Sequence, residues 1–156
     1  MMIEGVTVKQ LKTVPDERGW LMELLRSDCD CFENFGQAYV TSAYPQVVKA
    51  WHMHKKQTDN MSCIKGMIKL VLYDDREASK TKNEIDELFI GERNPALVTI
   101  PPKVWHGFKA ISDEYALIIN LPTELYNFKE PDEHRLPPDT ERIPYDWKLA
   151  TWLKHG

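Results

Sequence analysis

The sequence predicts an all-β protein, a sandwich or barrel of short strands in a single domain. Apolar residues recur with a period of two or in short runs, and turn residues separate these runs. No ten-residue segment between them carries the apolar stripe of a helix. With 156 residues and 42% hydrophobic content, the chain is long enough for one buried core and short for two domains.

Eight strands are predicted in order along the chain: Val6 to Leu11, Trp20 to Leu25, Gln37 to Ser42, Met61 to Ile64, Met67 to Tyr73, Glu87 to Ile90, Ala96 to Ile100 and Ala116 to Leu121. Turn chemistry fills the gaps, for example at Asp16 to Gly19 and at Lys65-Gly66. Asp28 to Phe35 is predicted to form a short helix or helical turn, with Asp28 as its cap.

The character of the chain changes after Pro122. The segment from Glu130 to Pro144 is rich in charge and in proline, which prevents regular ladder pairing. We expect a barrel over about residues 1–126 and an extended tail over about 127–156. The tail is predicted to lie over the barrel and to close with a helical turn at Trp147 to Leu153.

Composition narrows the functional classes. A formal net charge of −4 offers no basic surface for nucleic acid. The start of the chain lacks an export signal and no stretch is long enough to span a bilayer, so we expect a cytoplasmic protein with no membrane partner. The three cysteines, Cys29, Cys31 and Cys63, are expected to be reduced thiols, as is usual in that compartment.

Three histidines stand out. In a strand through residues 49–54, alternation places His52 and His54 on one face and Trp51 on the other. The segment from Ile100 to Phe108 has two prolines, a tight loop and then His106, which re-enters a strand and could face the same lumen. A single histidine is more often a structural residue, but three at such positions point to a site.

The chain resembles the dTDP-4-dehydrorhamnose 3,5-epimerase family, a branch of the jelly-roll cupins, from about Ile3 to Trp147. The pieces that carry the resemblance occur in the family's order: Asp16 to Trp20 with Glu23, Phe35 to Gln37, Lys49 to His52, Lys65-Gly66, Leu72 to Arg76, Ile100 to Pro102, His106 to Phe108, and Tyr126 ahead of Pro131 and Glu133. The resemblance implies a jelly-roll (double-stranded β-helix) barrel, a nucleotide-diphosphate sugar as ligand, a homodimer and no cofactor or metal.

The resemblance also implies a reaction. A C4 ketone acidifies the hydrogens on its neighbouring carbons, so a base can remove one and an acid can return a proton on the other face. The family's base falls on His52, its phosphate-binding arginines fall on Arg18 and Lys49, and Glu23 and Gln37 lie near the nucleotide.

Several positions depart from the family pattern. The family's proton-donating tyrosine falls on Asn120, and Tyr126 matches a second tyrosine; the lysine that stabilises the enolate falls near Asp59 or Asn60. The acidic partner of the base lies in a C-terminal extension that this chain is expected to lack, which would leave His52 weakly oriented. We therefore predict His52 and Tyr126 as catalytic residues, and the substrate-binding residues as Arg18, Glu23, Gln37, Lys49, His54, Asn60, His106 and Asn120. Inversion at C3, at C5 or at both stays open.

Two other functions stay open as well. The spacing of His52, His54, Asp59 and His106 also fits a metal-binding cupin enzyme, because three imidazoles and a carboxylate hold a divalent ion. The departures from the family pattern equally fit a cupin that binds a nucleotide sugar without catalysis.

Overall fold

The computed structural model describes residues 2–149. Within this range twelve strands form three antiparallel sheets, and no segment is a helix. The strands are β1 (Thr7–Gln10), β2 (Thr13–Asp16), β3 (Gly19–Met22), β4 (Tyr39–Ala43), β5 (Val48–Met53), β6 (Asp59–Lys65), β7 (Met67–Asp74), β8 (Ile85–Gly91), β9 (Ala96–Ile100), β10 (Val104–Ala110), β11 (Ala116–Asn120) and β12 (His134–Arg135). None of the described segments is a helix long and apolar enough to span a membrane.

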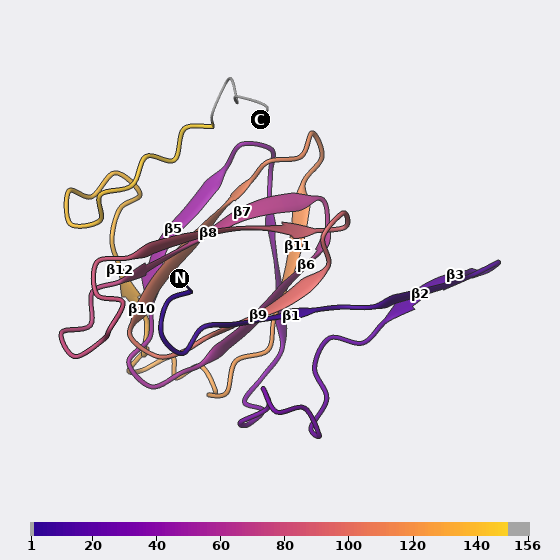
Figure 1. Ribbon diagram of the computed structural model, residues 1–156, viewed down its shortest axis with the longest axis horizontal. Coiled ribbons are helices and arrows are strands. Elements are labelled where there is room, and N and C mark those ends of the chain that lie inside the picture. The colour runs from indigo at the N-terminus through magenta and orange to yellow at the C-terminus, as the bar shows by residue number, and fades with distance from the viewer. Residues whose placement is uncertain (1, 150–156) are drawn as a thin grey trace.

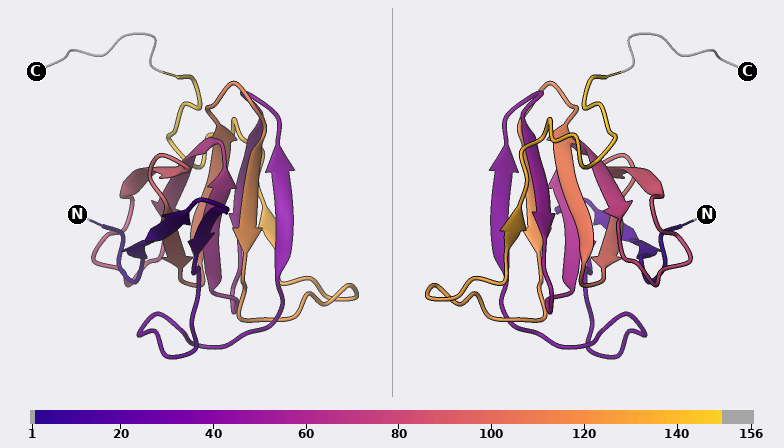
Figure 2. Two further views of the ribbon diagram at one scale, coloured as in Figure 1. Left: turned by 90° about the vertical axis from the view of Figure 1, so that its right-hand side faces the viewer. Right: turned by 90° about the vertical axis from the view of Figure 1, so that its left-hand side faces the viewer.

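Two five-stranded sheets make up the body of the molecule, with the orders β1-β9-β6-β11-β4 and β12-β5-β10-β7-β8 (Figures 1 and 2). The chain passes back and forth between the sheets from β4 to β7 and again from β8 to β11, which is a jelly-roll path. Aliphatic side chains of both sheets share one core, including Leu70 and Leu72 of β7 and Val98 and Ile100 of β9. The predicted fold class is confirmed.

The tail packs against one face of the second sheet. Ile143 and Trp147 are buried in a cluster with Trp51, and the rings of Trp51 and Trp147 lie 5.0 Å apart between centroids. Trp51 thus faces the tail, and alternation along β5 turns His52 to the opposite face. Most of the helical turn predicted at Trp147 to Leu153 lies outside the described residues.

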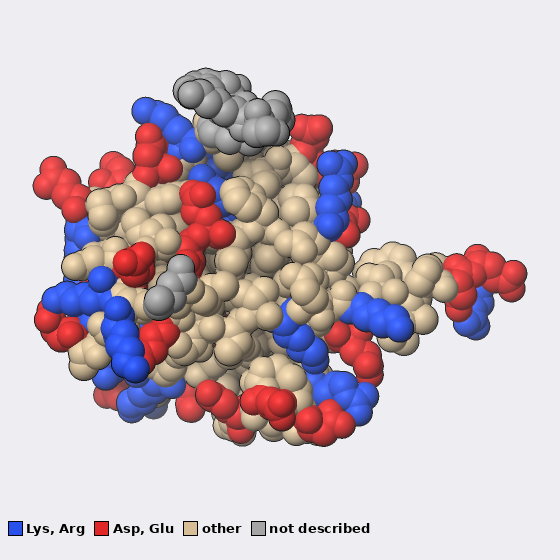
Figure 3. All heavy atoms as spheres, viewed as in Figure 1, with Lys and Arg blue, Asp and Glu red and all other residues tan. Residues whose placement is uncertain are grey.

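The hairpin of β2 and β3 projects away from the body (Figure 1). In the space-filling view its stem is largely uncharged and its tip carries charges of both signs (Figure 3). Three large apolar side chains of the hairpin, Val14, Trp20 and Leu21, are 52%, 59% and 61% exposed.

Each of the eight predicted strands overlaps an observed one, and the two histidine segments form β5 and β10. The sequence reasoning missed β2 and β12. β2 contains Pro15, but it pairs only with β3 in a two-stranded ribbon, where a proline is tolerated. β12 is two residues long and lies in the proline-rich tail.

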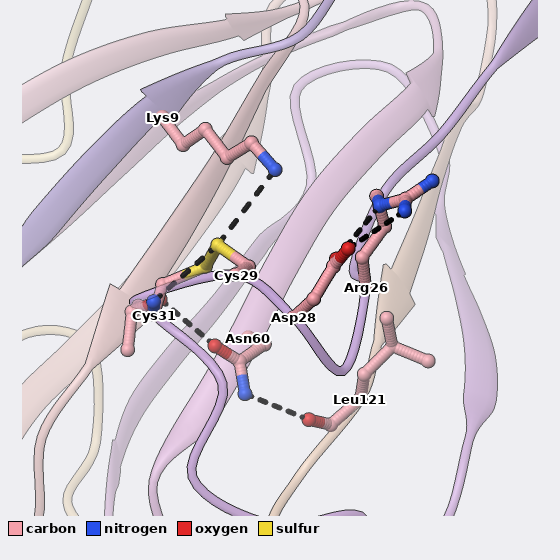
Figure 4. The surroundings of a disulfide bond; sticks show 8 residues. Lys9, Arg26, Asp28, Cys29, Cys31, Asn60 and Leu121 are labelled. Carbon is pink, nitrogen blue, oxygen red and sulfur yellow. Dashed lines mark hydrogen bonds and ion pairs between the residues drawn. A yellow bond between two sulfur atoms is a disulfide. The ribbon is translucent and has the colours of Figure 1, made fainter.

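Of the short helix or helical turn predicted over Asp28 to Phe35, only a turn is present: it occupies the first residues and is closed by a hydrogen bond of 2.9 Å from Phe32 N to the carbonyl of Cys29. The Asp28 carboxylate accepts two hydrogen bonds of 2.8 Å from the guanidinium of Arg26 and therefore does not cap a helix. Figure 4 shows this pair beside the turn.

Two cysteines in this turn are joined by a disulfide, which corrects the expectation of reduced thiols at Cys29 and Cys31 (Figure 4). The turn brings their Cα atoms to 5.2 Å, a separation within the ordinary range of disulfides. Cys63 is buried and free, as expected.

Gly107 allows the close approach of β10 to β5. A Cβ at this position would lie 2.3 Å from the Cβ of Ala50, so no larger residue fits without displacement of a strand. The register shifts here, and His106 of β10 lies opposite His52 of β5. This pairing brings two of the predicted site residues together.

Candidate active site

A cavity of about 410 Å³ is bounded by both sheets and by the tail. Residues 39, 41, 61 and 120 line it from the first sheet, and residues 49, 52, 106 to 108 and 135 from the second. The sequence-predicted residues that line it are Gln37, Lys49, His52, His54, His106, Asn120 and Tyr126.

His52 has a carboxylate beside it, contrary to the expectation that the chain lacks one. Glu133 Oε1 lies 3.1 Å from His52 Nδ1, and the Glu133 side chain is 14% exposed. The acid arrives here because β12 pairs with β5 and places Arg135 opposite His52. A carboxylate at Nδ1 favours the tautomer that carries its proton there, which leaves Nε2 free to accept a proton.

The protonation states fit a base held by a charged partner. Burial lowers the pKa of His52 to about 4, and His106 adds to this effect while Glu133 opposes it. Burial acts to raise the pKa of Glu133, but the hydrogen bond and charge of Arg135 and the nearby His52 and His54 together outweigh it, so the net pKa is below the ordinary value. At neutral pH the imidazole is therefore uncharged and Glu133 is ionised.

The buried carboxylate of Asp59 lies close to His54 and His106. Asp59 is 1% exposed, and its Oδ1 accepts hydrogen bonds from Gln57 Nε2 at 2.8 Å and from Asn120 Nδ2 at 2.6 Å. Its Oδ2 lies 3.6 Å from His54 Nε2 and 3.5 Å from His106 Nε2. The side chains of His54, Asp59 and His106 thus converge.

Backbone carbonyls orient both of these imidazoles. His54 Nδ1 donates to the carbonyl of Asp132 at 2.5 Å, and His106 Nδ1 donates to that of Val104 at 3.2 Å. Both Nε2 atoms therefore point toward Asp59. His54, Asp59 and His106 offer ligand atoms within 4.8 Å of one another, whereas His52, the fourth residue of the predicted metal set, is not part of this group.

A tyrosine that the sequence reasoning did not single out lines the same cavity. Tyr39 of β4 lies opposite Asn120 of β11, and its hydroxyl accepts a hydrogen bond of 2.9 Å from Asn120 Nδ2. The signal was available, because Tyr39 is two residues beyond Gln37 and alternation puts both on one face. Arg135, which was not predicted either, also lines the cavity and pairs with Glu133 at 2.8 Å.

Tyr126 lies on the loop after β11. Its ring packs edge-on against Phe128, with 4.9 Å between centroids, and the two side chains are 40% and 88% exposed. Both line the cavity, and the loop that carries them, with Phe128 almost fully exposed, borders its mouth.

Three predicted residues do not line the cavity. Arg18 is at the tip of the projecting hairpin, 85% exposed, and Glu23 pairs with Arg26 at 3.0 Å. Asn60 is buried, and both ends of its amide are used within the protein: Nδ2 donates to Leu121, as Figure 4 shows, and Oδ1 accepts from Thr99.

Comparison with known proteins identifies the family. Residues 1–154 match the dTDP-4-dehydrorhamnose 3,5-epimerase family. The chain belongs to this family. It is therefore an epimerase, an enzyme of the isomerase class.

Relatives extend over almost the whole chain. A probable low-salt glycan biosynthesis epimerase, Agl13 of Haloferax volcanii, is 49% identical over 93% of this chain and 94% of its own. The spore coat polysaccharide biosynthesis protein SpsL of Bacillus subtilis is 45% identical over 94% of this chain and 97% of its own. A dTDP sugar isomerase from Desulfovibrio desulfuricans has the same fold, with a TM-score of 0.89 and 34% identity over 94% of both chains.

Proposed function

We propose that this epimerase inverts a carbon next to the C4 ketone of a nucleotide-linked 4-keto-6-deoxy sugar, and that the product enters a surface polysaccharide or glycan. The observation that carries the proposal is the pair of His52 and Glu133 inside the cavity, 3.1 Å apart. The names of the glycan epimerase and the spore coat protein support the polysaccharide destination. Such a substrate also implies a cytoplasmic enzyme.

The first step is proton abstraction. His52 Nε2 removes the proton on the carbon beside the ketone, and the electron pair moves into a C–C double bond and onto the ketone oxygen. Glu133 stabilises the imidazolium that forms, because a negative charge near Nδ1 favours the protonated ring. A phenol in the cavity returns a proton to the other face; the sequence predicted Tyr126 for this step, although the family's own donor position falls on Asn120, and Tyr39 lines the cavity as well.

The cationic side chains at the cavity support a diphosphate ligand. Lys49 and Arg135 both line it, and Lys49 also donates to Thr41 Oγ1 at 2.9 Å. A lysine supplies charge to a phosphate without the fork of an arginine, while Arg135 provides such a fork next to it. Gln37 adds an amide at the same opening.

We further propose a homodimer. Arg18 does not line the cavity of its own chain, so its predicted role with the nucleotide requires a second subunit. A partner that covers the hairpin would bury the exposed Trp20 and Leu21. We expect light scattering to give a dimer for the wild-type protein and a monomer for the double variant Trp20→Ser, Leu21→Ser. A monomeric wild-type protein would contradict this assignment.

One experiment tests the activity. The protein is incubated in deuterium oxide with dTDP-4-keto-6-deoxyglucose, and the signals at C3 and C5 are followed by proton NMR. We expect deuterium to replace the proton at one or both carbons, and the site of exchange identifies the carbon that is inverted. Tight binding of the nucleotide sugar with no exchange would instead show a binding protein without this catalysis.

A second candidate is a metal-binding enzyme, which the meeting of His54, Asp59 and His106 favours. The carbonyl bonds at both Nδ1 atoms are the outer contacts that metal-binding histidines usually have. If this candidate holds, protein purified without chelator contains a divalent ion in 1:1 ratio, His54→Gln loses it, and dialysis against chelator abolishes turnover. Undiminished exchange by metal-free protein would reject it.

A further inference from the structure

Epimerisation needs two groups on opposite sides of one carbon. The base removes a proton from one face, and inversion requires a second group to deliver a proton to the other face. If that second group is absent, the base can still return a proton to the face from which it came. The following inference rests on the proposed function and concerns which residue is the second group.

The two walls of the cavity place Tyr39 across from His52. His52 comes from β5 in one five-stranded sheet, and Tyr39 comes from β4 in the other, beside Asn120 of β11. A sugar ring held between the sheets therefore has an imidazole on one side and a phenol on the other. Asn120 has no proton to give at any physiological pH, because its side chain is an amide.

The hydrogen bonding of Tyr39 leaves its proton available. The phenol oxygen accepts from Asn120 Nδ2 at 2.9 Å, and among the described residues its own O–H donates to no acceptor. The same hydrogen bond from Asn120 would stabilise the phenolate that remains after the proton has left. Asn120 thus prepares Tyr39 to act as a donor.

The electrostatic surroundings keep Tyr39 protonated until it is used. Burial raises its pKa above the ordinary value, the bond from Asn120 opposes this, and the carboxylates of Asp59 and Glu133 add to the increase. The phenol is therefore neutral across the physiological range. It can act as an acid there and not as a competing base.

Tyr126 is about as exposed as Tyr39, at 40% against 42%, but it has different contacts. It lies on a loop at the mouth of the cavity and packs edge-on against the exposed Phe128. No described residue forms a hydrogen bond with its hydroxyl. An aromatic pair at an opening is suited to cover a ring-shaped ligand.

We propose that Tyr39 delivers the proton to the face of the sugar opposite His52, and that Tyr126 shapes the mouth of the cavity. In the forward step the carbon–hydrogen bond breaks, its proton moves to His52 Nε2 and its electrons form the enolate. In the return step the carbon takes the phenol proton of Tyr39 and the enolate becomes a ketone again. The Tyr39 phenolate then takes a proton from water. The His52 imidazolium gives its proton to water, so both side chains return to their starting states.

The test compares deuterium exchange with inversion in Tyr39→Phe and Tyr126→Phe. The side chain of His52 is 32% exposed, so its proton exchanges with solvent and the base alone can label the carbon. For Tyr39→Phe we expect exchange within about tenfold of wild type and inversion reduced by about 100-fold or more. Tyr126→Phe should raise KM and keep the wild-type ratio of exchange to inversion.

The outcomes distinguish failure of the Tyr39 assignment from failure of the proposed function. Binding of dTDP by each variant shows that its site is folded. Exchange without inversion in Tyr126→Phe, or inversion at the wild-type rate in Tyr39→Phe, would overturn the assignment of Tyr39. Absence of exchange in the wild-type protein would overturn the proposed function itself, and the inference with it.

Discussion

Replacement of Glu133 by glutamine removes the charge that stabilises protonated His52 and keeps the shape of the side chain. The full charges lie 3.1 Å apart, which corresponds to about 5 kcal/mol at an effective dielectric constant near 20. Arg135 already binds the same carboxylate at 2.8 Å, and the His52 side chain is 32% exposed. We therefore expect the variant to lose roughly 3 kcal/mol of transition-state stabilisation, which corresponds to about a 100-fold decrease in kcat.

The assay is the initial rate of epimerisation, followed by NMR at saturating substrate. Glu130→Gln is the matched control, because Glu130 is an exposed acid of the same tail and does not line the cavity. We expect this control to keep wild-type kcat, and both variants to bind dTDP as the wild type does. A kcat for Glu133→Gln within threefold of wild type would refute the role of Glu133 as the partner of His52.

Three further predictions concern pH, stability and strand packing. Because the pKa of His52 is lowered to about 4, the neutral base persists in acid, and kcat/KM should fall with a midpoint below pH 6; a midpoint at or above 6.5 would contradict this. Asp74 is fully buried and accepts hydrogen bonds from Arg76 at 2.8 Å through both oxygens, so Asp74→Asn should cost about 3 kcal/mol of unfolding free energy in urea titrations. The exposed Asp146→Asn should cost less than about 0.5 kcal/mol, and equal losses would show that the buried pair has no special role. Gly107→Ala should reduce both stability, by about 1–3 kcal/mol, and activity; unchanged activity would show that the contact of β10 with β5 does not position the base.

The strands and the histidines were predictable from the sequence because they depend on local patterns. Alternation over a few residues was enough to put His52 and His54 on one face, and the turn chemistry marked the ends of the strands. The short helix at Asp28 failed for a local reason too. Its cap residue is bound by Arg26, a competing partner two residues away.

The carboxylate partner of His52 could not be predicted in the same way. Glu133 is far from His52 in the sequence, and it reaches this histidine only because β12, a two-residue strand in a proline-rich tail, pairs with β5. No periodicity is visible over two residues. The acid was therefore expected in the family's C-terminal extension, although Glu133 was among the residues that carry the family resemblance.

The position of Asp59 was predictable from the sequence only in part. Asp59 was recognised from its spacing to the histidines, but spacing alone did not show which histidines it meets. Tertiary packing directs His54 and His106 toward it and turns His52 toward Glu133. The separation of His52, which lies beside Glu133, from the two histidines that meet Asp59 is a property of the assembled barrel.

The central claim, that an imidazole in the cavity removes the proton beside the ketone, is tested most directly with His52→Asn. Asparagine fills similar space and cannot act as a base at neutral pH, so binding of dTDP should be retained within about threefold while deuterium incorporation falls by at least about 100-fold. Retained binding with the wild-type rate of deuterium incorporation would contradict the claim.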